Sequence, residues 1–253
     1  MKNELIKILK RTALSILALG LSYLFMLLFP ALLFAHEIEY RQCKIYSDKT
    51  IDCKIFEIID SSITRVSKSE LYDTSQHFRL FICNDLWRFW IFTQGNTLAG
   101  GVAQYNFTRD IFFRPCDIPN NKIIPPKEWY FADNPFTFKD RPLIYYFSHE
   151  ITHIMQSRYT GRGSWRYPTW LTEGYADYIG KGGNFNFQDN LRLWHNKAPE
   201  LDPTKGLYRL YHLKVSYLLD DKGKTLKDIY KNIPNDAIIT NELRDLSYKN
   251  DAN

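Results

Sequence analysis

The strongest constraint on the fold is a run of 24 uncharged residues near the N-terminus, Thr12 to Ala35. A helix of this length can cross about 30 Å of hydrocarbon, whereas a buried helix without any polar face is rare in a small domain. Four basic residues precede the run, as in the flank of a signal sequence: Lys2, Lys7, Lys10 and Arg11. We predict that residues 1–35 form a signal peptide or a signal anchor, and both alternatives stay open.

The position of the basic flank predicts where the rest of the chain lies. Positive residues tend to stay on the cytoplasmic side, so residues 36 onward are predicted to be exported: secreted, periplasmic or extracytoplasmic, or tethered to the membrane by residues 1–35. Setting aside the four basic and one acidic residue of 1–35 reduces the totals from 33 and 28 to 29 and 27. A net charge of +2 is too small to indicate a nucleic-acid-binding surface, so we expect no nucleic-acid partner.

The cysteines all follow the membrane segment, where an oxidising compartment would permit disulfides. Four cysteines allow three pairings, of which we favour Cys43 with Cys53 and Cys83 with Cys116. Four buried free thiols are the alternative. No C-x-x-C spacing occurs, which argues against a cysteine zinc site.

The first half of the exported part is predicted to form strands. Two short stretches separated by a polar turn have strand composition: Cys43–Asp48 and Cys53–Ile59. Three later stretches are rich in aromatic and β-branched residues, as half-buried strands are: His77–Asp85, Leu86–Thr93 and Asp110–Cys116. A sheet is therefore expected before any long helix.

The hydrophobic period then changes to that of helices. Pro142 suits a first helical turn and the apolar residues that follow fit one stripe, so residues 141–159 are predicted to be helical. Further helices are predicted at 169–180, 207–223 and 225–233. The fold class is α+β, a small mixed sheet followed by a helical half. We divide the chain into the membrane segment 1–35, a β-rich N-terminal extension at 36–75, and a main domain at 76–253.

The stretch FSHEITHIMQ, residues 147–156, lies in the first of these helices. His149 and His153 are four residues apart and therefore share one helix face. A catalytic zinc uses three protein ligands and leaves the fourth position to water, and these histidines can supply two. Glu150 can reach such a water as a general base. Two solvated histidines on an ordinary helix are the alternative that the motif alone leaves open.

Glu173 is the obvious carboxylate for a third ligand, and nineteen residues separate it from His153. With this spacing, and with the stretch PTWLTEGYADY at 168–178, the sequence resembles the gluzincins, the thermolysin-like and aminopeptidase-like zinc peptidases. The resemblance implies a zincin-like metallopeptidase domain at 76–253. It also implies a Zn²⁺ cofactor held by three ligands: His149, His153 and Glu173.

The resemblance implies further roles around the metal. Asp177 lies where thermolysin-like enzymes keep an aspartate that holds the first ligand histidine, so it is expected to orient His149. Tyr208 falls where aminopeptidase-like gluzincins place the tyrosine that stabilises the oxyanion. Three other residues are alternative donors: Tyr211, His212 and His195.

One departure from the family pattern bears on the activity. The G-x-M-E-N strand of the aminopeptidases, whose glutamate holds the substrate amine, is absent. The nearest stretch, LAGGVAQYNF at 98–107, contains no acid, which favours an endopeptidase. This stretch is predicted to be either an edge strand that pairs with an extended peptide or an ordinary hairpin turn.

These observations predict an exported or membrane-anchored zinc metallopeptidase that acts on peptide or protein substrates. Glu150 and Tyr208 are its predicted catalytic residues, the first as the base and the second as the oxyanion donor. Two alternatives remain. The chain could be a catalytically inactive binding or scaffold protein with a zincin fold, or it could hydrolyse a non-peptide amide such as a cell-wall crosslink.

Overall fold

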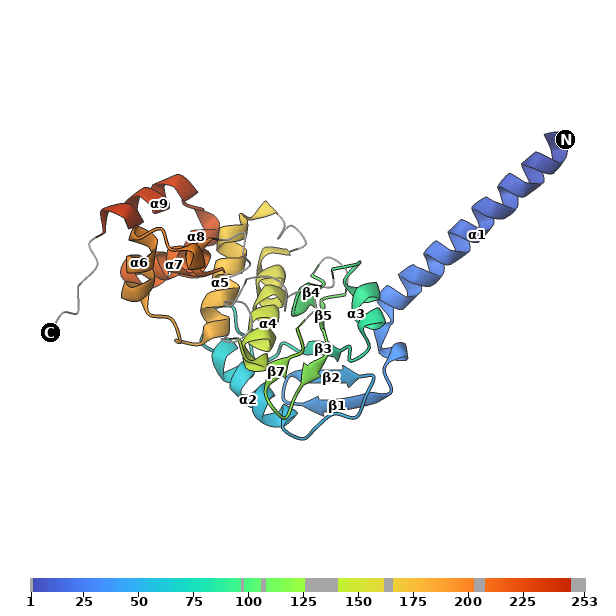
Figure 1. Ribbon diagram of the computed structural model, residues 1–253, viewed down its shortest axis with the longest axis horizontal. Coiled ribbons are helices and arrows are strands. Elements are labelled where there is room, and N and C mark those ends of the chain that lie inside the picture. Colours follow the sequence, from blue (N-terminus) through green and yellow to red (C-terminus); the bar gives the residue numbers. More distant parts are fainter. Residues whose placement is uncertain are drawn as a thin grey trace.

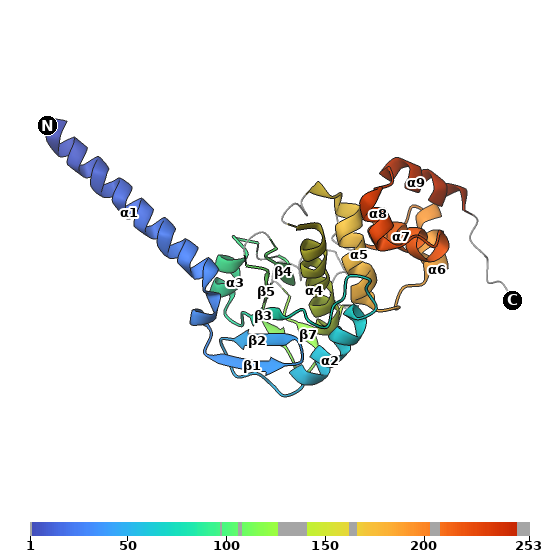
Figure 2. The same cartoon turned by 180° about the vertical axis from the view of Figure 1, so that it is seen from behind.

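The computed structural model of the chain describes residues 2–96, 98–105, 108–125, 141–161, 166–202 and 208–246. A long N-terminal helix, α1 (Lys2–Leu28), projects from a body that contains a sheet and all other helices (Figure 1). The body is layered. Helix α4 (Leu143–Thr160) lies between the sheet and α5 (Thr169–Lys181), and the C-terminal helices lie beyond α5 (Figure 2). Within the described residues, α1 is the one helix with the length and composition to cross a membrane.

The main sheet has five strands in the order β1-β2-β3-β5-β4. The strands are β1 (His36–Tyr40), β2 (Cys43–Ser47), β3 (Phe78–Ile82), β4 (Gly101–Ala103) and β5 (Asp110–Phe113). The central strands β2, β3 and β5 are parallel, and β1 and β4 pair antiparallel at the two edges. The predicted mixed sheet is confirmed. Within the stretch 98–107, residues 101–103 form the edge strand β4, whereas pairing with an extended peptide stays a prediction and residues 106–107 lie outside the described part. A two-stranded ribbon, β6 (Cys116–Asp117) with β7 (Lys122–Ile123), follows.

Both faces of the central strands are buried, because successive side chains point to opposite faces of a sheet. Alternate residues face the main core under α4: Leu80, Ile82, Ile111 and Phe113. The residues between them face a second, aromatic cluster on the other side: Phe81 and Phe112, with Tyr46, Phe89 and Phe92. The sheet therefore separates a helical side, which carries α4, from a side that carries α3 (Leu86–Phe92) and the end of α1.

The helical half contains both predicted and unpredicted elements. The helices predicted at 141–159 and 169–180 are confirmed as α4 and α5. The helix predicted at 207–223 corresponds to α7 (Arg209–Ser216) and a π-helical turn, η6 (Tyr217–Asp221), and that at 225–233 to α8 (Leu226–Lys231). Four further elements were not predicted: α6 (Phe187–His195), α9 (Asp236–Asp245), and the 3₁₀ turns η1 (Pro30–Leu33) and η4 (Pro199–Leu201).

Two strand predictions are wrong. Residues 53–59 lead into α2 (Ile55–Val66), whose buried residues recur at helical spacing: Ile55, Ile58, Ile59, Ser62, Ile63 and Val66. The predicted strand Leu86–Thr93 is α3, which buries Phe89 and Phe92 but exposes Trp87 and Trp90. In both stretches the branched and aromatic composition indicated a strand, whereas the spacing of the buried residues is that of a helix. The predicted β-rich extension thus contains a helix, and its strand β2 pairs with β3.

Neither predicted disulfide is present, and all four cysteines are free. Cys43 faces the main core from β2, where burial raises the pKa of its thiol to about 12. Cys53 is exposed just before α2. Residues 53–59 do not form the predicted second strand of a hairpin, on which the pairing of Cys53 with Cys43 depended. Burial also raises the pKa of the Cys83 and Cys116 thiols.

Candidate metal centre

Helix α4 carries the two motif histidines side by side. His149 and His153 share one face of α4, as their four-residue spacing predicts, and their Nε2 atoms are 3.1 Å apart. The helix begins after Pro142, whose extended backbone forms the N-cap. Phe147, which lies between Pro142 and His149, is buried against Phe113 of β5, and their ring centroids are 4.2 Å apart. Packing of α4 on the sheet thus directs the histidine face toward β4 and α5.

Glu173 reaches the same point from α5. Its Oε2 lies 3.3 Å from the Nε2 atom of His149 and 3.4 Å from that of His153. Ligands about 2.0 to 2.2 Å from a tetrahedral ion lie about 3.3 to 3.6 Å from one another. The two separations from Glu173 fall within that range and the separation of 3.1 Å between the histidines lies just below it, and two imidazole nitrogens with one carboxylate oxygen form a donor set suited to zinc. The structure therefore brings together the three predicted ligands in an arrangement that could hold a metal ion.

The three groups are also coupled electrostatically. Burial opposes ionisation of Glu173, but the two histidines hold the pKa of its carboxyl well below the usual range. Burial likewise lowers the pKa of His153, but the charges of Glu173 and Glu150 outweigh it and raise this pKa to about 9. Without a metal ion, His153 therefore keeps a proton at neutral pH. An incoming ion must displace this proton.

Glu150 follows the first histidine and lies between α4 and β4. Burial raises the pKa of its carboxyl, while the two histidines and a hydrogen bond from the backbone of Ala103 act in the opposite direction. Gly101 of β4 makes room for this side chain, because a Cβ atom there would lie 2.8 Å from the Glu150 Cγ atom. The carboxylate lines the same cavity as the three candidate ligands, where a water-activating base would have to be.

Tyr208 lies across the cavity from the helix that carries the histidines. It is the N-cap residue of α7 and has a left-handed backbone with φ of 51°, which is uncommon for a residue with a bulky side chain. Its ring stacks on His149 with centroids 5.8 Å apart and an interplanar angle of 15°. The charge of Glu173 and burial both raise the pKa of the Tyr208 hydroxyl, which therefore stays a hydrogen-bond donor.

The alternative oxyanion donors do not line this cavity. Tyr211 lies on α7, whose close approach to α5 depends on Gly174: a Cβ atom there would lie 2.5 Å from the Tyr211 carbonyl oxygen. His212 is buried behind α5, where its ring stacks on Phe185 with centroids 3.6 Å apart. His195 ends α6. Of the four candidates, Tyr208 alone borders the three candidate ligands.

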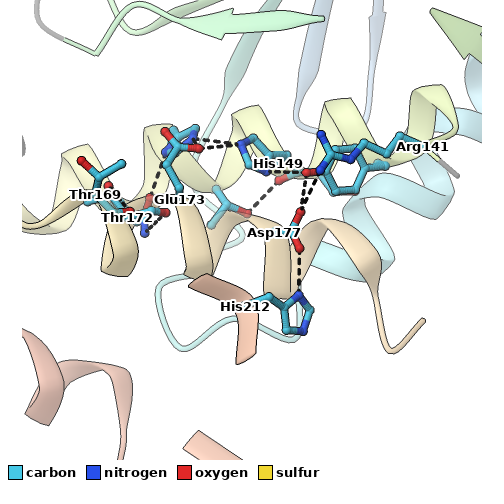
Figure 3. A network of polar contacts seen from close by, with 12 residues as sticks. Arg141, His149, Thr169, Thr172, Glu173, Asp177 and His212 are labelled. Carbon is cyan, nitrogen blue, oxygen red and sulfur yellow. Dashed lines mark hydrogen bonds and ion pairs between the residues drawn. The ribbon is translucent and has the colours of Figure 1, made fainter. Parts of the chain in front are cut away.

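Asp177 reaches His149 through a residue that was not predicted (Figure 3). The Tyr145 hydroxyl donates to Oδ1 of Asp177 at 2.6 Å and lies 3.3 Å from Nδ1 of His149. The expected direct contact between Asp177 and His149 is therefore replaced by a two-step link. The reason is steric, since the tyrosine one turn before His149 on α4 fills the space between the histidine and α5. Its i, i+4 spacing to His149 is the sequence signal that could have indicated this role.

Asp177 is surrounded by positively charged and donor groups. Its Oδ2 atom lies 2.5 Å from Nζ of Lys181 and 2.9 Å from Nδ1 of His212, and Arg141 approaches Oδ1 at 4.0 Å. Burial opposes ionisation, but Lys181 and His212 hold the pKa of the aspartate well below its usual range. Burial lowers the pKa of His212 to about 4, so its ring is neutral and donates through Nδ1. The carboxylate is thus ionised and paired although fully buried.

The cavity in front of the candidate ligands has a volume of about 580 Å³. Its walls come from Phe92–Gln94 with Asn96, from the run Leu98–Tyr105 that includes β4, and from the face of α4 that carries the histidines, together with Arg141, Glu173 and Tyr208. A smaller cavity of about 250 Å³ lies on the other side of His153 and Glu173, beside Thr172 and Tyr230. The candidate metal centre therefore lies between two recesses.

The arrangement combines the groups that hydrolysis of an acyl bond requires. Two histidines and a glutamate converge on one point, a buried carboxylate lies beside them, and a tyrosine hydroxyl faces them. Side chains of these types can serve as metal ligands, as a general base and as an oxyanion donor. No protein-family model, curated protein or solved structure gives a significant match to this chain.

Proposed function

We propose that this chain is a zinc-dependent metallopeptidase of the gluzincin type that cleaves within peptide chains. The convergence of His149, His153 and Glu173, with ligand atoms 3.1 to 3.4 Å apart, carries the proposal. A site of three such ligands leaves one position for water, which is the pattern of catalytic rather than structural zinc. The buried carboxylate of Glu150 beside them supports a hydrolytic role.

Each residue has a defined part in the proposed reaction. Zinc, when bound, would act as a Lewis acid on the scissile carbonyl and lower the pKa of water at the site. Glu150 would accept the proton of the attacking water and pass it to the leaving amine. The Tyr208 hydroxyl would donate a hydrogen bond to the carbonyl oxygen as this atom gains negative charge. Tyr145 and Asp177 would hold the His149 ring in place.

Strand β4 supports a peptide as the substrate. It is one of the two edge strands of the main sheet and borders the cavity, so its outer edge can pair with an extended chain through main-chain hydrogen bonds. No acidic residue occurs in the stretch 98–107 to hold a substrate amine. Both observations favour cleavage within a chain over removal of an N-terminal residue.

Helix α1 supports export, with the body on the far side of the membrane. The basic residues before Thr12 favour this orientation. Of the two alternatives, the structure favours an anchor that stays attached over a cleaved signal. Leu27 is buried in the aromatic cluster of the body, and the Tyr23 hydroxyl donates to the carbonyl of Ile91 at 2.9 Å.

Zinc content is the first test of the proposal. The full-length chain, purified in detergent and supplied with zinc, should retain about one ion per molecule. Glu173→Ala should lose most of it, whereas the matched change Glu39→Ala, on an exposed residue of β1, should not. A folded wild-type chain that takes up no zinc would refute the metallopeptidase proposal.

Turnover separates an enzyme from an inactive scaffold. Glu150→Gln should abolish cleavage of a casein or peptide-library substrate while zinc stays bound, and Glu39→Gln should leave it unchanged. Cleavage by Glu150→Gln at the wild-type rate would remove the base assignment. A zinc-loaded wild-type chain that cleaves neither peptides nor cell-wall crosslinks would instead support the scaffold alternative.

A further inference from the structure

Helix α3 has an apolar outer face, unlike an ordinary surface helix. Its inner residues Phe89 and Phe92 are buried in the aromatic cluster on the far side of the sheet from α4. Its outer residues are large and exposed: Leu86 at 50%, Trp87 at 48% and Trp90 at 57%. A helix on the surface of a soluble domain normally carries polar residues at these positions. Exposed apolar surface of this kind marks a binding face.

The one charged residue of α3 is held by neighbouring elements. The guanidinium carbon of Arg88 lies 4.4 Å from the centroid of the Trp87 ring, and the Nε atom donates to the carbonyl of Leu33 at 3.1 Å. Its NH1 group pairs with Asp48 at 3.2 Å and with Asp85 at 2.5 Å. The guanidinium thus ties α3 to η1 and to the residue after β2, and covers part of Trp87, while Trp87 and Trp90 both stay about half exposed.

Helix α3 is attached to the end of α1. Besides the Arg88 contact with Leu33, the Tyr23 hydroxyl hydrogen-bonds the Ile91 carbonyl, and Leu27 is buried in the cluster that contains Phe89. Figures 1 and 2 both show α3 beside the last turns of α1. The apolar face of α3 therefore has a defined place relative to any membrane that α1 crosses.

The length of α1 indicates how deep in the bilayer the apolar face of α3 lies. About 20 helical residues cross the hydrocarbon of a bilayer, and counting from Thr12, directly after the last basic residue, this span ends near Ala31. The far boundary of the hydrocarbon thus lies near η1, and α3, which is tied both to η1 and to Tyr23, lies beside the far half of the span. Two exposed residues continue the apolar surface here, Phe29 at 52% and Leu32 at 71%. Tryptophan is enriched at this membrane depth.

We propose that the outer face of α3, with Trp87 and Trp90, lies in the far-side interface of the bilayer that α1 spans. The partner of this face is the boundary between lipid head groups and acyl chains. The body would then rest on the membrane surface in one orientation, instead of moving freely on a tether. The proposal requires that α1 stays attached to the chain.

This docking would set the substrate class of the proposed peptidase, and that consequence rests on the proposed function. The cavity wall formed by Phe92–Gln94 begins at the last residue of α3, so one wall of the cavity continues directly from the docked helix. The candidate ligands lie on the other face of the sheet from α3. Two packed layers of about 10 Å each separate them from α3, a distance of about 20 Å. An extended chain covers that distance in about six residues. The favoured substrates are therefore exported segments that emerge from the same membrane.

Quenching by brominated lipid tests the docking without any activity. The full-length chain is reconstituted into phosphatidylcholine vesicles with plain or brominated acyl chains, and flotation with the vesicles verifies insertion. Brominated lipid should reduce tryptophan emission by about a third, because two of the six tryptophans lie at the interface. Trp87→Phe/Trp90→Phe should lose this response, and Trp194→Phe on α6 should keep it.

Three results would overturn the docking proposal. The first is a chain that does not float with the vesicles, because α1 would then not be an anchor. The second is equal emission from plain and brominated vesicles, and the third is quenching that persists in the double variant. A second copy of the chain on this face would produce the second result, and crosslinking in the vesicles would then trap a dimer.

The substrate consequence has its own test. A library peptide that the enzyme cleaves in solution is attached to a lipid through a spacer of about ten residues, long enough to reach the ligands. It should be cleaved at least tenfold faster on vesicles than its soluble form, and Trp87→Glu/Trp90→Glu should remove this advantage while soluble cleavage persists. Equal rates for both forms would refute the substrate class. If the enzyme cleaves no library peptide in solution, the peptidase proposal is refuted and the quenching result stands.

Discussion

Replacement of Tyr145 by phenylalanine tests the indirect link between Asp177 and the candidate ligand His149. The change removes one hydroxyl and leaves the ring, which packs between α4 and α5. It deletes the 2.6 Å hydrogen bond to Asp177 and the 3.3 Å contact with Nδ1 of His149. If the hydroxyl orients the imidazole, zinc affinity should fall although no ligand has been changed.

The distances determine the expected size of the effect. Removing a partner that orients a ligand histidine typically costs ten- to a hundredfold in metal affinity. The contact between Tyr145 and His149 is at the long end for a hydrogen bond, so we expect a loss near the lower bound, about tenfold or 1.4 kcal/mol. Asp177 keeps its contacts with Lys181 and His212, so the free energy of unfolding should fall by only about 1 to 2 kcal/mol.

The assay is competition for zinc between the full-length chain and a chromophoric chelator. Tyr175→Phe is the matched control, because its buried hydroxyl also makes one short hydrogen bond, at 2.7 Å to Ser69. It should lose similar stability, since the same group is removed, but should bind zinc as the wild type does. Equal zinc affinity in Tyr145→Phe and Tyr175→Phe would refute the orienting role of Tyr145.

Three further predictions address the base, the core and the metal-free site. Gly101→Ala should lower kcat at least tenfold in a peptide assay with zinc content unchanged, because the added Cβ displaces the Glu150 carboxylate. Phe112→Ala should lower the free energy of unfolding in urea by about 3 to 5 kcal/mol, because its ring stacks between two others in the aromatic cluster. When a chelator keeps the site free of metal, the pKa of His153 is raised from 6.5 to about 9. The protonated His153 therefore stabilises the fold fully below pH 6.5, and this contribution is lost as the pH rises through 9. The pKa of Glu173 is depressed, so its ionised carboxylate stabilises the fold above the ordinary pKa of 4.5, and this contribution is lost in acid. Tm should therefore be highest between pH 4.5 and 6.5. It should fall toward pH 9, and the fall should be smaller in Glu173→Gln.

The elements whose length and composition agree were predictable from the sequence. Helices α4 and α5 are long stretches with an apolar stripe at helical spacing, and β3 is a short run of aromatic and branched residues that is buried on both faces. In α3 spacing and composition disagree. Its seven residues are mostly aromatic or branched, as in a strand, while burial follows helical spacing because Phe89 and Phe92 fill the aromatic cluster. Tertiary packing decides such short segments, and composition does not show it.

The site also has a part that local spacing predicts and a part that only tertiary packing decides. The spacing within α4 places His149 and His153 on one face whatever the rest of the chain does. The role of Tyr145 depends on how closely α5 crosses α4 and on the side-chain rotamer. The bilayer-facing residues Trp87 and Trp90 likewise depend on where α1 ends against α3. No local pattern in the sequence carries that information.

Asp177 connects the three helices that build the site. Its carboxylate accepts from Tyr145 on α4 and from His212 on α7, and it pairs with Lys181 on α5. Since Tyr208 is the N-cap of α7, one buried group positions both the ring of His149 and the helix that follows the proposed oxyanion donor. Because Tyr145 lies between this carboxylate and the ring, His149 meets a hydroxyl oxygen instead of a full negative charge, and Lys181 compensates the charge of Asp177. The ring is thereby oriented with a smaller gain in basicity than a direct carboxylate would give, which would leave a zinc ion in this site a stronger Lewis acid.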